Sequence, residues 1–300
     1  MPVMGGSAHL IAVGAPSGAL ERAAERLRHL EALWSRFRPT SEISLLNARG
    51  GAPTVVSVDT LRLVEVAVRS WRLTQGAFDP TVLAAVEALG YDRTFEQVRP
   101  QDSIAAGSRP GAGSGQDRRA PGCAEIGCDT SALTVTLPVG CRFDPGGIGK
   151  GLAADIVTQQ LLDEGAAGAC ANVGGDVRVR GTSLDGRDWV VGIDDPHHTG
   201  EQLTSLVMTD AGLATSSRLL RRWGSDRHHL VDPSTGLPTD NDLDAVSIAA
   251  GDAALAEALT KAAFVRGAEA VLPLLNGVGA AGLFVHRDGR VSRSTAWPSD

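Results

Sequence analysis

Residues able to do chemistry gather in five short stretches of this sequence. The densest is residues 144–151 (DPGGIGKG), directly ahead of a predicted helix that carries Asp155. Its glycines let backbone groups approach a ligand closely, and helix-opening amides beside Lys150 favour an anionic group such as a pyrophosphate. Gly151 stands where a P-loop has Ser or Thr, so the stretch is not a P-loop. A tight strand-to-helix turn is the alternative.

Two further stretches combine a carboxylate with glycines or with an aromatic ring. Residues 172–176 (NVGGD) follow a predicted helix and strand, which places them at an end of the sheet, although Gly-Gly-Asp also makes ordinary turns. Residues 76–81 (GAFDPT) set Phe78 beside Asp79 directly after a helix end. Core packing of Phe78 and helix capping by Asp79 are the competing interpretations.

The fourth stretch, residues 228–236 (HHLVDPSTG), carries two histidines. His229 lies three residues before Asp232, a spacing that suits either a general base or a hydrogen-bonded turn. A metal site on His228 and His229 is disfavoured, because adjacent side chains of an extended segment point to opposite faces.

The fifth stretch is an alanine-rich helical segment at residues 253–267. Glu257, Thr260 and Lys261 stand at i, i+3 and i+4, so they share one helical face. They converge on one ligand, or Glu257 and Lys261 form a solvated surface pair.

Helices and short strands must position these stretches. Apolar residues recur at helical spacing over residues 20–34, 59–76, 152–165 and 253–265, with Asp59 as the expected N-cap of the second helix. Strand-like runs are residues 177–179, 189–193, 246–249 and 282–285, the last followed by an Asp-Gly turn at residues 288–289. The mixture predicts an α+β fold.

Composition excludes several classes of protein. With 300 residues and 43% hydrophobic side chains the chain can bury a core, and a net charge of −7 offers no broad attraction to nucleic acid or anionic membranes. It has no apolar run long enough for a transmembrane segment and no signal peptide at its start, so we expect a cytoplasmic protein as supplied, or an extracytoplasmic one if the start is truncated. The four cysteines are expected as free thiols, with a Cys123 to Cys128 pair as the alternative in an oxidising compartment.

One segment breaks the helical and strand patterns. Residues 99–122 consist mainly of Gly, Ser, Ala, Pro, Gln and Arg and hold almost nothing able to anchor a core, which predicts a disordered insertion. Because the part before it has too few strands to close a core alone, we expect a single domain over residues 1–300.

The order of these motifs resembles the ApbE-type family, the FAD:protein FMN transferases. The resemblance runs from Met4-Gly5 through residues 35–44 (SRFRPTSEIS), all five stretches above and residues 214–217 (ATSS), and leaves out only the predicted insertion. It implies an ApbE-like (T-fold-like) α+β domain with mixed and antiparallel sheets and packed helices.

The resemblance also implies a flavin transferase that moves FMN from FAD to a Thr or Ser hydroxyl of a partner flavoprotein and releases AMP. The alternatives are an FAD pyrophosphatase that gives FMN and AMP, and a non-catalytic flavin-binding protein. His229 matches the histidine that precedes Asp-Pro in the family, and we assign it to deprotonating the acceptor hydroxyl. The residues that match the family's FAD site are Met4, Phe37, Ala77, Phe78, Asp79, Asp144, Lys150 and Val231.

This chain departs from the family's pattern at the magnesium site that the resemblance implies. There a glycine-loop carbonyl, here that of Gly147, joins an Asp and a Thr one helical turn apart; the matching residues are Glu257 and Lys261, with Thr260 between them. Lysine cannot replace threonine as a ligand, because an ammonium group has no lone pair. The implied ligands of Mg²⁺ are therefore Gly147, Glu257 and Thr260, with a water in the gap. Alternatively the charge of Lys261 substitutes for the cation, or catalysis is lost and flavin binding remains.

Overall fold

The computed structural model describes residues 1–98, 119–223 and 227–298. These residues form two compact units. The first comprises residues 1–31, 148–217 and 242–300, and the second comprises residues 32–147 and 218–241, the undescribed positions excepted. The single domain expected over residues 1–300 stays a prediction. Most of the predicted insertion at residues 99–122 lies outside the described residues.

The first unit is built on an eight-stranded sheet in which every neighbouring pair is antiparallel. The strand order is β1-β2-β6-β7-β10-β15-β16-β17. The bounds are β1 Pro2–Val3, β2 Gly6–Val13, β6 Gly168–Val173, β7 Asp176–Gly181, β10 Gly212–Ser217, β15 Leu243–Ala250, β16 Ala281–His286 and β17 Val291–Arg293. Tight turns set the register: Gly174 and Gly175, both at positive φ, join β6 to β7.

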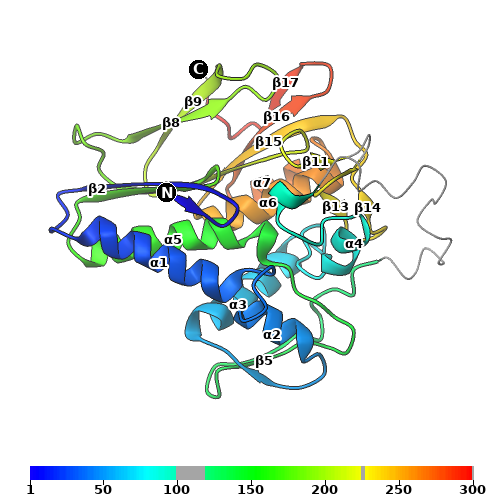
Figure 1. Cartoon of the computed structure of the whole chain (residues 1–300). Helices are drawn as coiled ribbons and strands as arrows, with labels where there is room; N and C mark the ends of the chain where they lie inside the picture. Colours follow the sequence, from blue (N-terminus) through cyan, green and yellow to red (C-terminus); the bar gives the residue numbers. More distant parts are fainter. Residues whose placement is uncertain (99–118, 224–226, 299–300) are drawn as a thin grey trace. The chain divides into compact units, whose positions relative to one another are not determined.

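Two alanine-rich helices pack on this sheet. Helix α5 (Gly149–Asp163) contacts β6 and β7, helix α6 (Ala253–Arg266) contacts β10 and β15, and the two helices contact each other (Figure 1). Most of their residues are buried, which explains why neither has one clear polar face. The short helix α7 (Leu272–Gly277) precedes β16.

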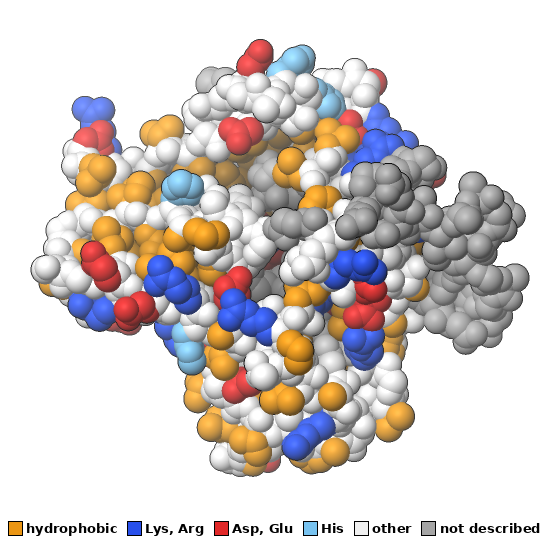
Figure 2. Space-filling view, in the orientation of Figure 1, with side chains coloured by type: hydrophobic (Ala, Val, Ile, Leu, Met, Phe, Trp, Pro, Cys, Tyr) orange, Lys and Arg blue, Asp and Glu red, His pale blue; other side chains and the backbone are white. Residues whose placement is uncertain are grey.

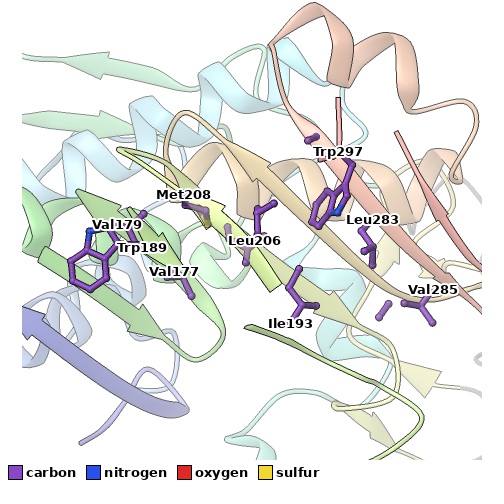
Figure 3. Close-up of a cluster of buried hydrophobic side chains, with 12 residues drawn as sticks. Val177, Val179, Trp189, Ile193, Leu206, Met208, Leu283, Val285 and Trp297 are labelled. Atoms are coloured by element: carbon purple, nitrogen blue, oxygen red, sulfur yellow. The ribbon is translucent and has the colours of Figure 1, made fainter. Parts of the chain in front are cut away.

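The hairpin of β8 (Trp189–Asp194) and β9 (Gln202–Met208) completes the first unit. Figure 3 shows its inward side chains, among them Trp189, Ile193 and Leu206, beside residues of the large sheet such as Val177 and Leu283. Because successive strand residues point to opposite faces, Val190 and Val207 lie on the outer side of the hairpin and are exposed.

The second unit consists mainly of helices and short strands. Helix α1 (Ala19–Trp34) begins in the first unit and ends in the second. The other helices are α2 (Glu42–Ala48), α3 (Val58–Leu73), α4 (Leu83–Ala88) and the 3₁₀ turns η1 (Phe95–Gln97) and η3 (Pro145–Gly147). The strands are β3 (Thr54–Val55), β4 (Gly127–Asp129), β5 (Thr134–Thr136), β11 (Arg222–Trp223), β12 (Arg227–His228), β13 (Val231–Asp232) and β14 (Leu237–Pro238).

The four predicted helices and four predicted strand runs are all present, with corrections at their ends. The N-cap of α3 is Ser57, whose hydroxyl accepts from the amide of Thr60, and Asp59 lies in the first turn. On α1 the predicted apolar stripe is buried at Ala23, Leu27, Leu30 and Trp34, whereas Leu20 is exposed.

The surface carries charged side chains of both signs. On the face drawn in Figure 2, acidic and basic side chains are interspersed. No helix among the described residues has the length and apolar character needed to cross a membrane.

Candidate active site

In the first unit Lys150 meets two buried carboxylates. It lies in the first turn of α5, and its ammonium donates to Oε1 of Glu257 at 2.6 Å and contacts Oδ2 of Asp176. The Glu257 side chain is fully buried and that of Asp176 nearly so. A buried carboxylate is tolerated only with a charge partner or full hydrogen bonding. Glu257 has both kinds of partner: the ammonium of Lys150, and the Gly151 amide, which donates to Oε2 at 2.8 Å.

Lys261 joins the same group from α6. Its ammonium donates to Ser216 Oγ at 2.9 Å, lies 3.4 Å from Thr260 Oγ1 and lies 3.6 Å from Glu257 Oε1. The predicted convergence on one helical face is therefore present, and the alternative of a solvated Glu257 to Lys261 surface pair is wrong because Glu257 is fully buried. We call Lys150, Asp176, Glu257 and Lys261 the lysine–carboxylate tetrad.

Burial and opposite charge compete over each pKa in the tetrad. Burial alone would lower the pKa of Lys150, but attraction by Asp176 and Glu257 outweighs it, so the pKa is raised. Burial would raise the pKa of Glu257, but Lys150 and Lys261 outweigh it, so the pKa is lowered. The pKa of Asp176 is raised to about 6 by burial and by the like charge of Glu257, against the pull of Lys150. Burial lowers the pKa of Lys261, and Glu257 offsets this only in part.

Two contacts hold the tetrad's helices together. A Cβ on Gly151 would lie 2.3 Å from the carbonyl oxygen of Ala253, so only glycine permits this approach of α5 to the start of α6. Asp155 accepts from the amides of Ala253 and Ala254 at 3.0 and 2.9 Å. Burial raises the pKa of Asp155 to about 6, although these amides oppose the shift.

The tetrad leaves little place for a divalent cation. Magnesium prefers octahedral oxygen ligands at roughly 2.0–2.1 Å. The oxygens offered by Glu257, Thr260 and Ser216 already surround the ammonium of Lys261, and Glu257 also binds Lys150. Among the described residues no group of three or more His, Cys, Asp or Glu side chains could hold a metal ion. Gly147 ends η3, three residues before Lys150, and its role as a ligand stays a prediction. The predicted ligands Glu257 and Thr260 therefore do not fit Mg²⁺ in this arrangement.

In the second unit Asp79 is a buried carboxylate whose hydrogen-bond donors among the described residues are all neutral. Its Oδ1 accepts from the Thr81 amide at 2.8 Å and hydroxyl at 2.6 Å, and its Oδ2 accepts from Trp71 Nε1 at 3.1 Å. Burial raises its pKa against these hydrogen bonds. Capping of the next helix by Asp79 is wrong, since α4 begins after Val82 with no side-chain cap. Ala77 and Phe78 are buried beside it.

A hydrogen bond joins Asp144, at the start of the glycine loop, to the segment that carries Asp79. The Asp144 amide donates to the Pro80 carbonyl at 2.7 Å, which joins the two predicted motifs. Asn47 fixes the preceding residue by hydrogen bonds to both the amide and the carbonyl of Phe143. The Asp144 carboxylate then accepts from the Gly146 amide at 2.9 Å.

Arg36 connects the loop to an aromatic cluster. Its guanidinium lies 4.3 Å from the Phe37 ring centroid, 4.5 Å from that of Tyr91 and 3.8 Å from Oδ1 of Asp144. Phe37 packs on a buried cluster that also contains Trp223 and Val231. The second unit therefore brings Phe37, Val231, Asp79 and Asp144 into one connected network.

The two histidines of residues 228–236 differ in environment. His228 is buried, and its ring accepts from the Leu230 amide at 3.3 Å and lies 3.2 Å from the Thr239 carbonyl, which makes it part of the local framework. His229 is half-buried, two residues before Val231. Met4 lies in the first unit, in the β1–β2 turn, where its amide donates to Glu31 at 2.7 Å.

The comparisons with known proteins decide the family. The ApbE family model matches residues 4–284. The chain belongs to the ApbE family. It is 32% identical over 308 residues to the FAD:protein FMN transferase of Treponema pallidum, with 92% of this chain and 79% of the relative covered. It is 27% identical to the protein of that name from Haemophilus influenzae, with 82% and 72% covered.

Solved structures agree with the ApbE assignment. The ApbE protein of Thermotoga maritima superposes with a TM-score of 0.85 at 27% identity and covers 98% of this chain and 96% of its own. The flavin transferase ApbE from Vibrio cholerae gives a TM-score of 0.82 at 24% identity, covering 99% and 96%, a likeness of fold. The predicted family and the ApbE-like α+β fold with antiparallel sheets are confirmed.

Within this ApbE chain, two members of the first-unit cluster were not assigned from the sequence. Asp176 and Ser216 lie in motifs that carried the resemblance, but they had no role there. The sequence does carry a signal for this cluster: only two of the 28 basic residues are lysines, and both lie in the tetrad, where they contact Asp176 and Ser216. In the second unit Arg36, Trp71 and Thr81 were missed, because none has a distinctive spacing.

Proposed function

We propose that this protein transfers FMN from FAD to a Thr or Ser hydroxyl of a partner flavoprotein. The acceptor oxygen attacks the phosphorus of the FMN half, the bond from that phosphorus to the AMP oxygen breaks, and AMP leaves with that oxygen. The acceptor proton passes to a base. FAD and the acceptor hydroxyl thus become a phosphoester and AMP, with no change of oxidation state.

The observation that carries this proposal is the start of α5. Ile148 at its N-cap makes no side-chain hydrogen bond, and in the first turn the Gly151 amide donates to Glu257 Oε2, which leaves the amides of Gly149 and Lys150 as those without a side-chain acceptor among the described residues. Free amides at a helix N-terminus favour an anionic group, and the ammonium groups of Lys150 and Lys261 lie beside this helix. We assign the pyrophosphate of FAD to this place and the charge that develops on it to the amides and Lys150.

The remaining predicted residues have roles on the flavin and adenosine parts. Phe37, Phe78, Ala77, Val231 and Met4 offer apolar contacts. Asp79 and Asp144 can accept hydrogen bonds from ribose hydroxyls or an amino group. The donors that Asp79 already has among the described residues, Trp71 and Thr81, are neutral.

His229 is the proposed base. A hydroxyl is a weak nucleophile until its proton is taken, and imidazole titrates in the range where this is efficient. The proposed steps use no magnesium ion at Glu257 and Thr260, because these residues do not fit one.

The products separate this function from its alternatives. Purified protein is incubated with FAD, with and without a candidate acceptor domain, and AMP, free FMN and protein-bound yellow fluorescence are followed. AMP with labelled acceptor supports transfer. AMP with free FMN indicates an FAD pyrophosphatase, and intact bound FAD indicates a flavin-binding protein.

The neighbouring histidines give a matched pair of variants. His229→Ala is expected to abolish acceptor labelling while FAD binding, measured by flavin fluorescence, stays within about twofold, because removal of a general base alone costs roughly 10²–10⁴ in rate. His228→Ala is expected to lower stability by about 1–3 kcal/mol through its lost hydrogen bonds but to label the acceptor. Undiminished labelling by His229→Ala would refute the base assignment.

A further inference from the structure

The use of lysine in this chain is unusually concentrated. The sequence has 28 basic residues, and only Lys150 and Lys261 are lysines. Both are mostly buried, with side-chain exposures of 16% and 17%, and both lie within 4 Å of Oε1 of Glu257. Since burying a long charged side chain is costly, placing both lysines beside one buried carboxylate indicates a specific use for their charge.

The surroundings of Lys261 are those of a hard cation. One carboxylate oxygen, from Glu257, and two hydroxyl oxygens, from Ser216 and Thr260, lie within 3.6 Å of its ammonium nitrogen. Carboxylate and neutral oxygens are also the donors that a divalent cation prefers. The ammonium occupies the position among these oxygens that a bound ion would need.

The charges of the tetrad also indicate that Lys261 stands in the place of a bound ion. Two ammonium groups face the two carboxylates of Asp176 and Glu257, so the tetrad is neutral without any added ion. A divalent ion bound to Glu257 would lie within a few ångströms of two like charges in a buried place, where such repulsion is strong.

We infer that the ammonium of Lys261 takes the place of a divalent cation in this protein, so that it binds no metal ion at Glu257 and handles FAD without one. The part about FAD rests on the proposed function; the part about metal binding does not. No bond to Lys261 forms or breaks, and its proton stays on Nζ. Its role is that of a fixed positive charge beside the place at the start of α5 to which we assign the pyrophosphate of FAD.

Manganese is the probe that tests metal binding directly. Mn²⁺ is titrated into the full chain, with and without FAD, and free Mn²⁺ is measured by electron paramagnetic resonance against FAD alone. We expect the wild-type chain to leave the free signal unchanged at one equivalent. Stoichiometric capture of Mn²⁺ by the wild-type chain beyond the capture by FAD alone would overturn the inference.

Two variants locate the effect. Lys261→Thr removes the ammonium and adds a hydroxyl among the oxygens of Glu257, Ser216 and Thr260, so it is expected to capture about one Mn²⁺. Val265→Thr adds the same hydroxyl one turn further along α6 and keeps Lys261, so it is expected to capture none. If folded Lys261→Thr binds no more Mn²⁺ than the wild-type chain, Lys261 does not occupy an ion's place.

A second measurement works on the wild-type chain alone. With lysine labelled by ¹⁵N, only two side-chain ammonium signals exist to be assigned, because the chain has only two lysines. We expect both to keep their intensity when one equivalent of Mn²⁺ is added. Selective broadening of these two signals would place the ion at the tetrad and overturn the inference.

Activity separates the two proposals. FAD turnover, as AMP release, is expected to stay within about twofold when EDTA replaces Mg²⁺, a change of under about 0.5 kcal/mol in the barrier. Loss of turnover in EDTA that Mg²⁺ restores would overturn the inference and leave FMN transfer standing. If no flavin product forms with or without metal, the proposed function fails, and the manganese readouts still decide the metal question.

Discussion

Glu257 in the first unit and Asp79 in the second are both buried carboxylates, yet their pKa values shift in opposite directions. Glu257 has 0% of its surface exposed and Asp79 has 7%. Lys150 and Lys261 overcome the burial of Glu257 and lower its pKa. Within the part of the chain that the structure describes, Asp79 accepts hydrogen bonds only from Trp71 and Thr81, and burial outweighs them, so its pKa is raised.

The difference shows what a hydrogen bond cannot do for a buried charge. Three hydrogen bonds from neutral donors fill most of the roughly four acceptor sites of Asp79 but do not balance its charge, whereas an ammonium group both donates and balances charge. Glu257 is therefore committed to holding the lysines in place. Asp79 remains able to take a further donor, which suits recognition of a hydroxyl or amino group on a ligand.

The largest expected effect is on stability when Glu257 loses its charge. Glu257→Gln leaves Lys150 and Lys261 facing only Asp176, and breaking a buried ion pair costs about 3–5 kcal/mol. Urea unfolding of the full chain measures the loss. The control is Glu164→Gln in the exposed Arg22 to Glu164 pair, where solvent screens the charges and no resolvable change is expected. Equal losses in the two variants would remove the distinction between the tetrad and a surface pair.

A smaller loss of stability is expected when Asp79 is replaced. Asp79→Asn keeps the shape but turns an NH₂ group toward one of three donors, which costs about 1–3 kcal/mol. The same urea experiment measures it, with the exposed Asp92→Asn in the same unit as control. A loss as large as that of Glu257→Gln would show that Asp79 also has a charge partner.

The two variants should respond to pH with opposite signs. A lowered pKa gives stability that is present above the ordinary value of 4.5 and is lost as pH falls through the folded-state pKa, so the deficit of Glu257→Gln shrinks toward acid. A raised pKa gives stability that is complete below the ordinary value of 3.8 and is lost as pH rises through the folded-state pKa. The deficit of Asp79→Asn therefore grows toward acid. Unfolding midpoints between about pH 2 and pH 7 cover both ranges, and parallel trends would contradict the assigned shifts.

The smallest effect concerns the thiols near Asp79. All four cysteines are free, so the alternative of a Cys123 to Cys128 pair is not formed. Burial, then repulsion from Asp79, raises the pKa of Cys141 to about 11, whereas burial alone raises that of Cys170 to about 11. Iodoacetamide should alkylate the exposed Cys128 first.

Asp79→Asn should then speed alkylation of Cys141 slightly and leave Cys170 unchanged. Peptide mass spectrometry over time measures each rate at alkaline pH. Equal acceleration of Cys170 would mean that the variant loosens the fold and does not act through charge.

Much of this protein could be predicted from local sequence. Periodic apolar residues located α1, α3, α5 and α6, and turn residues such as Gly174 located the hairpin ends. These signals are local, because helix periodicity and the φ preference of glycine need no distant partner. The motif order likewise sufficed for the family. The cap of α3 was missed because Ser57 and Asp59 both suit an N-cap, and only the backbone path chooses between them.

The sequence by itself determined that Glu257, Thr260 and Lys261 share a helical face, because i, i+3 and i+4 are neighbours on any α-helix. Only the tertiary structure decided that this face is buried, that Lys150 and Asp176 meet it and that Ser216 binds Lys261. Burial depends on what packs against a helix, and the partners here come from α5, β7 and β10, as many as 107 residues away along the chain. The same holds for Asp79, whose pKa is set by enclosure, a property that no short stretch of sequence encodes.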